Sequence, residues 1–140
     1  MSYFNRLRRH AVVSAALSSA AAILFLGGPA IGQDGSTSEE QMLAFNNHCR
    51  TCHVTNEDDH RLGPSLHDII GSEAGSKPGF GYSSSMANAD IVWDTETLDR
   101  FIADPDAVVP GNNMKPYSGI ASSEERAKII AYLEAESAGQ

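Results

Sequence analysis

The sequence predicts an all-α protein. In three stretches, hydrophobic residues recur at helical spacing behind residues that commonly cap a helix. No stretch alternates apolar and polar residues in the way of a half-buried strand, and no internal repeat is present. The chain has 140 residues, enough for one domain. We therefore expect three main helices, joined by short helices and loops.

The first predicted helix begins at a capping box. Ser36 and Thr37 are each followed three residues later by a glutamate, so either can cap the helix. The helix should continue through Met42 and Phe45, which share a face as core residues do, into the segment at Cys49.

The stretch after this helix predicts mostly loops. Residues 54–62 are polar and acidic, and residues 66–70 are a brief apolar run that fits one or two helical turns. Residues 71–85 are rich in Gly, Ser and Pro, a composition typical of a flexible linker. Because Phe80 and Tyr82 lie within them, we expect instead an ordered loop folded over something apolar.

Capping residues mark the later helices. Residues 83–89 predict a short helix, and Asp94 predicts a second, with Leu98, Phe101 and Ile102 on one face. Asp104 followed by Pro105 predicts a further cap with proline in the first turn.

The last helix should open with a capping box formed by Ser122 and Glu125. Its apolar stripe is expected at four positions, flanked by Ile129 and Tyr132. The stripe consists of Ala127, Ile130, Ala131 and Leu133.

A short motif follows the first helix: Cys49-Arg50-Thr51-Cys52-His53. This spacing is typical of covalent haem attachment. Within one helical turn both sulfurs can reach the vinyl groups along one side of a porphyrin, while the histidine projects onto the iron. Thioether bonds from Cys49 and Cys52 would hold one haem c permanently, with His53 as an axial ligand and methionine as the usual second ligand.

The same motif has other interpretations. A dithiol redox pair would call for a βαβ context, which the sequence lacks, and a zinc site would call for a second cysteine pair. A structural disulfide fits an exported chain. The adjoining histidine favours haem over all three.

The N-terminal residues 1–32 predict a signal peptide, leaving 33–140 as a monohaem domain. Arg6, Arg8 and Arg9 form a basic segment, residues 11–26 are apolar, and small residues end at Gly32. An uncleaved membrane anchor is the alternative, since residues 11–28 are just long enough to span a bilayer. Alanine and serine dilute the apolarity of this stretch and favour cleavage, which predicts a periplasmic protein without stable membrane insertion.

The charge balance bears on partners. The formal net charge is −8, and removing residues 1–32 would remove three arginines and no acidic residue. So acidic a surface argues against nucleic acid or anionic lipid as a partner.

Taken together, these motifs resemble a short-chain class I cytochrome c of the mitochondrial and bacterial type. The likeness covers residues 39–136. Besides the attachment motif, the matching stretches are His60-Arg61-Leu62-Gly63-Pro64-Ser65-Leu66, Pro78-Gly79-Phe80 with Tyr82, Trp93, Pro110-Gly111-Asn112-Asn113-Met114, and residues 125–133.

The resemblance implies an iron ligated by His53 and Met114. Met86 competes for the second position, but its serine-rich setting lacks the Pro-Gly loop that presents the ligand in this family. The resemblance also implies that the Pro64 carbonyl accepts a hydrogen bond from the His53 ring, and that His60 ties two loops together.

Further residues take family roles in the same way. Tyr82 and Trp93 resemble the groups that hydrogen-bond a buried haem propionate. Asn88 and Asn112 resemble polar groups of the inner pocket. Two aromatic residues, Phe45 and Tyr132, resemble the pair at the crossing of the first and last helices.

The sequence departs from the family at the haem surroundings and at the docking face. Phe101 replaces a tyrosine near the methionine sulfur, Ser72 replaces an arginine beside a propionate, and Gln41 replaces the glycine of the helix crossing. Mitochondrial members carry a ring of lysines around the haem edge. The matching positions here are His48, Asp106, Ala107 and Asn113, with Lys115 positive nearby.

The implied function is that of a soluble periplasmic one-electron carrier between respiratory or dehydrogenase partners, monomeric and not an enzyme. Its redox partner should present a basic or apolar docking face. The alternatives are a dedicated acceptor of one periplasmic dehydrogenase, a haem peroxidase, or a gas-binding haem protein.

Overall fold

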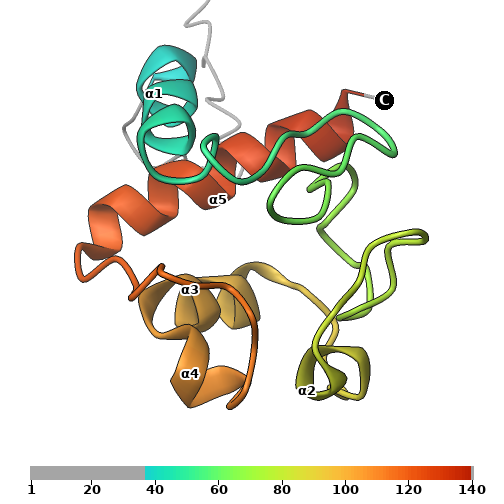
Figure 1. Ribbon diagram of the computed structural model, residues 1–140. Helices are drawn as coiled ribbons and strands as arrows, with labels where there is room; N and C mark the ends of the chain where they lie inside the picture. The colour runs from blue at the N-terminus through green and yellow to red at the C-terminus, as the bar shows by residue number, and fades with distance from the viewer. Residues whose placement is uncertain (1–36, 140) are drawn as a thin grey trace, which may run out of the picture. The chain divides into compact units, whose positions relative to one another are not determined.

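A computed structural model describes residues 37–139 (Figure 1). The predicted signal peptide lies outside these residues. They contain helices and no strand, which confirms the all-α prediction, and one isolated antiparallel bridge pairs Glu73 with Val92. The helices are α1 (Ser38–His48), α2 (Ser84–Ala87), α3 (Thr95–Ala103), α4 (Pro105–Val108) and α5 (Ser123–Ala138). Over the same residues, no helix has the length and apolarity needed to cross a bilayer.

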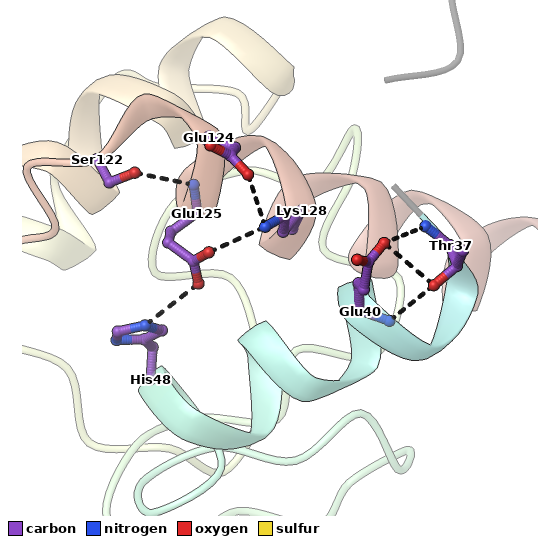
Figure 2. Close-up of polar contacts among 7 residues, drawn as sticks. All are labelled: Thr37, Glu40, His48, Ser122, Glu124, Glu125 and Lys128. Atoms are coloured by element: carbon purple, nitrogen blue, oxygen red, sulfur yellow. Dashed lines mark hydrogen bonds and ion pairs between the residues drawn. The ribbon is translucent and has the colours of Figure 1, made fainter. Parts of the chain in front are cut away.

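Helix α1 begins where the capping box predicts and packs against α5. Thr37 and Glu40 bond reciprocally to each other's backbone (Figure 2); Ser36, the alternative cap, lies outside the described residues. Ala44 and Phe45 form the buried face, and the Phe45 ring stacks on Tyr132 of α5 with centroids 4.7 Å apart. The prediction that Met42 is a core residue is wrong, because Met42 is 45% exposed.

Helix α5 is capped at Ser122, but not by a complete capping box. The Ser122 hydroxyl accepts a hydrogen bond from the Glu125 backbone as predicted. The Glu125 carboxylate turns instead toward Lys128 and toward His48 of α1 (Figure 2). The buried face of α5 also differs from the predicted apolar stripe. Ile129, predicted to flank the stripe, is 0% exposed, whereas Ala127 of the stripe is exposed.

Helices α3 and α4 share one residue as a cap. Asp104 ends α3, and its carboxylate accepts from the first turn of α4, which has Pro105 at its start as predicted. Helix α3 packs against α5 and α4. Its buried residues are Leu98, Phe101 and Ile102, as predicted.

The apolar run at residues 66–70 forms turns rather than the helix that its composition fits. The chain after it is held by backbone pairing instead, since Gly71 and Ala74 donate to the carbonyls of Trp93 and Ile91. The loop at 71–85 is ordered, as its aromatics predict, because Phe80 packs edge-on against Tyr82 at 4.9 Å.

Candidate haem-binding site

The attachment motif folds as a tight turn at the end of α1. The Cys49 N–H donates to the Phe45 carbonyl at 2.8 Å, and the N–H groups of Cys52 and His53 both return to the Cys49 carbonyl. Both cysteines are free thiols of intermediate exposure. Burial, and then the charge of Cys52, raise the pKa of Cys49 to about 12. The two sulfurs lie on one turn, as attachment to one porphyrin requires.

The imidazole of His53 is buried and held in one orientation. Its Nδ1 lies 2.8 Å from the Pro64 carbonyl oxygen, the contact that the family resemblance implies. A carbonyl only accepts, so Nδ1 carries the proton and Nε2 keeps the lone pair that a metal needs. Burial lowers the pKa of His53, with the bond to Pro64 acting in the opposite direction. Burial thus favours the neutral ring, and the bond to Pro64 orients it.

Gly63 makes room for this ring, a role that the sequence analysis did not assign. A Cβ at Gly63 would lie 2.2 Å from His53 Cε1 and 2.7 Å from both ring nitrogens. The Gly63 N–H also donates to the Cys52 carbonyl at 2.8 Å. The loop before Pro64 thus lies directly against the motif, and only glycine fits there without displacing the imidazole.

A second histidine secures that loop. His60 Nε2 lies 2.8 Å from the Pro78 carbonyl oxygen, and His60 Nδ1 accepts from the Ser65 N–H at 3.1 Å. These bonds tie the loop at 60–65 to the loop at 78, as the resemblance implies. The Phe80 ring packs near His60 as well, with centroids 5.6 Å apart.

The loop that carries Met114 is organised by a buried asparagine. The Met114 N–H donates to Asn112 Oδ1 at 2.9 Å, and Asn112 is 4% exposed. The burial of Asn112 agrees with its predicted inner position. Its amide also donates to the carbonyl of Val109 and to Asp106.

Tyr117, which the sequence analysis did not single out, ties the chain after this loop to the end of α3. Its hydroxyl donates to the Ile102 carbonyl at 2.7 Å. The pKa of Tyr117 is raised, first by burial and then by the nearby Cys49. Cys49 and Met114 also pack against the same hydrophobic core. The structure therefore places both candidate segments against one core. Met86 packs against that core too.

The remaining predicted site residues, Trp93, Tyr82 and Asn88, differ in how deeply they are buried. Trp93 is 5% exposed and packs on Phe101 with centroids 4.9 Å apart, and Tyr82 is half-buried. Asn88 is exposed, and its amide donates to the Ser84 carbonyl at the end of α2. Asn88 thus closes a helix turn, and its predicted place in an inner pocket has no support in these contacts.

These residues fit a covalently attached haem. Two free thiols on one turn can form thioethers, and an oriented neutral imidazole can ligate iron. Among residues 37–139, no group of three or more His, Cys, Asp or Glu side chains could hold a metal ion, so the zinc interpretation gains no support.

An all-α domain with this motif at the end of its first helix defines a c-type haem protein. The family model described as "Cytochrome c" matches residues 41–136. The chain belongs to the cytochrome c family, as a class I monohaem member, and Cys49 and Cys52 carry its haem.

The most similar proteins agree with this assignment. The chain is 39% identical to "Cytochrome c type-1" of Ascaris suum over 70% of this chain and 87% of that protein. It is 38% identical to "Cytochrome c2" of Rhodomicrobium vannielii over 88% of this chain and 90% of that protein. Among solved structures, cytochrome cH from Methylobacterium extorquens superposes with a TM-score of 0.64 at 31% identity, covering 71% of this chain and 99% of that one. These likenesses support an electron carrier.

Proposed function

We propose that this cytochrome c is a soluble periplasmic one-electron carrier whose haem iron is held between His53 and Met114. The observation that carries the proposal is the 2.8 Å contact between His53 Nδ1 and the Pro64 carbonyl. That contact turns a lone pair toward the site and holds it there, and a ligand that does not reorient lets electron transfer proceed with little rearrangement.

Met114 would supply the second ligand from the loop at residues 110–114. Asn112 holds the Met114 backbone, so the thioether is presented from a fixed turn rather than from a free segment. The haem, when bound, supplies the one-electron Fe(III)/Fe(II) couple. The protein holds two axial ligands and buries their surroundings. If His53 and Met114 both ligated the iron, peroxide or a gas could bind only by displacing one of them, which favours a carrier over the peroxidase and gas-binding alternatives.

Export to the periplasm is supported by the N-terminal sequence and one comparison. The match to the Rhodomicrobium vannielii cytochrome c2 covers 88% of this chain, more than residues 37–140 alone supply. The similarity therefore reaches into the segment that predicts a signal peptide. Mass spectrometry of the mature protein from a periplasmic fraction tests this: an N-terminus at Gln33 is expected, and one at Met1 would contradict cleavage.

This protein should act as a monomer, and its redox partner should present a basic or apolar face to it. Two cations near the site are neutralised, because Arg61 pairs with Asp59 and Lys115 pairs with Asp106. An acidic partner patch would find little free positive charge there. The rate of reduction by a basic redox protein should fall as ionic strength rises, and a rate that rises with salt would contradict this pairing.

The ligand assignment is tested by two matched variants. Met114→Ala should abolish the sulfur–iron charge-transfer band of the ferric protein and lower the reduction potential, because a thioether favours ferrous iron. Met86→Ala, which removes the competing methionine, should leave both unchanged. A band that survives Met114→Ala, or disappears in Met86→Ala, would overturn the assignment.

A further inference from the structure

A line of polar contacts runs from the protein surface to the backbone of Met114. The Met114 N–H donates to Asn112 Oδ1 at 2.9 Å. The Asn112 Nδ2 donates in turn to Asp106 Oδ1, also at 2.9 Å. The other oxygen of Asp106 pairs with Lys115.

The side chain of Asn112 cannot rotate without losing a hydrogen bond. Its Oδ1 accepts from Met114, and its Nδ2 donates to both Asp106 and the Val109 carbonyl. A carboxylate and a carbonyl can only accept, so Asp106 and Val109 together fix which end of the amide faces Met114, and Asp106 takes the second amide hydrogen. Because Asn112 is 4% exposed, an amide hydrogen left without its acceptor is largely cut off from water.

From this geometry we propose that Asp106 is a positioning residue for the iron-ligating loop. It acts through Asn112 and touches neither the iron nor the sulfur. The inference rests on the proposed ligation by Met114. Mitochondrial members have a lysine where this chain has Asp106. A lysine at position 106 would have no acceptor for the Asn112 amide, so the aspartate also has a consequence for the loop.

The test uses imidazole as a probe of loop opening in the ferric holoprotein, because imidazole must displace Met114 to reach the iron. Asp106→Ala should raise the apparent affinity for imidazole about tenfold, which corresponds to about 1.4 kcal/mol. Asp106→Asn keeps an acceptor oxygen and should stay within about twofold of wild type. Lys115→Gln breaks an exposed ion pair and should also stay within about twofold.

A matched control and a second readout separate positioning from general stability. Glu124→Ala removes a comparable exposed acid, which pairs with Lys128 in the first turns of α5, and it should not change imidazole binding. The Asp106 side chain is 60% exposed, so its removal should leave the fold intact, which denaturant unfolding checks. Hydrogen exchange of the Met114 amide should accelerate in Asp106→Ala alone.

The outcomes distinguish this inference from the proposed function. If wild type lacks the sulfur–iron band, ligation by Met114 fails and the inference fails with it. If the band is present and lost in Met114→Ala, but Asp106→Ala binds imidazole like wild type, the positioning role alone is overturned. It is also overturned if Asp106→Asn behaves like Asp106→Ala, because charge rather than the hydrogen bond would then be responsible.

Discussion

Gly63→Ala should destabilise the holoprotein through its effect on the His53 ring. The new Cβ would lie 2.2 Å from His53 Cε1. Two carbon atoms normally sit at about 3.5–4.0 Å, so the ring or the loop must retreat by more than about 1 Å. A shift of that size takes the 2.8 Å bond to the Pro64 carbonyl out of hydrogen-bonding range.

The two costs set the expected magnitude. Overpacking a well-filled site costs about 1–3 kcal/mol, and a lost hydrogen bond costs about 1 kcal/mol. The free energy of unfolding should therefore fall by about 2–4 kcal/mol. Guanidinium unfolding of the ferric protein, followed by haem absorbance and by circular dichroism, measures it.

Gly81→Ala is the matched control, because nothing lies within 4 Å of a Cβ at Gly81. This control should change the free energy of unfolding by no more than about 0.5 kcal/mol. If Gly63→Ala unfolds at the same denaturant concentration as Gly81→Ala, the imidazole is not held against that loop, and the reasoning about its orientation is refuted.

Three further predictions concern the helices that support the site. Phe45→Ala should lower the free energy of unfolding by about 3–5 kcal/mol, because the ring is 3% exposed and stacked, whereas Met42→Ala on the same helix should cost less than about 1 kcal/mol. Gly119→Ala should cost about 3 kcal/mol or more, since its Cβ would lie 2.0 Å from the Ala103 carbonyl oxygen at a φ of +103°. Asp94→Asn should make the melting temperature fall less steeply as the pH is lowered below about 4. Hydrogen bonds from Thr97, with its backbone N–H first, hold the pKa of Asp94 below its ordinary value. The contribution of Asp94 is thus complete above the unfolded-state pKa of about 3.9 and is lost as pH falls through the lower folded value.

Denaturant unfolding at neutral pH checks the first two of these, and melting temperatures between about pH 2 and pH 6 check the third. Equal losses in Phe45→Ala and Met42→Ala would contradict the burial of the aromatic pair. A Gly119→Ala protein as stable as wild type would contradict the close approach of that turn to α3. For Asp94→Asn, an unchanged slope with pH would show that its carboxylate is not the group responsible.

The sequence predicted the helix starts well, because caps are local. Thr37, Asp94 and Asp104 each bond to a backbone group only a few residues away, and such contacts need no tertiary information. The attachment motif is local in the same sense. One turn of chain contains both thiols and the imidazole, so its chemistry can be predicted without the fold.

The errors arise where a distant segment decides. Glu125 has the right spacing for a capping box, yet its carboxylate lies beside His48 of the distant helix α1, and beside Lys128, instead of returning to the cap. The run at residues 66–70 is apolar enough for a helix, but it forms turns that lead into a segment paired with residues 91–93. Periodicity likewise cannot fix the rotation of a helix, which is why Ile129 rather than Ala127 faces the core.

The site residues that the sequence analysis missed are also non-local. Gly63 matters because of where the His53 ring lies, and Asp106 because α4 brings it to Asn112. A signal was available for the glycine alone, as a residue directly before the proline that orients the histidine. For Asp106 the sequence signalled only a missing lysine at the docking face, because an exposed carboxylate looks the same whether it supports a loop or only faces water.

The contact between α1 and α5 joins segments from opposite ends of the described chain (Figure 1). Phe45 obtains its stacking partner only from Tyr132, which lies in the last helix of the described chain. Without that helix, the segment that leads into Cys49 and Cys52 would leave Ala44 and Phe45 open to water. Loss of α5 would therefore loosen the helix from which both cysteines extend, although neither cysteine lies in α5.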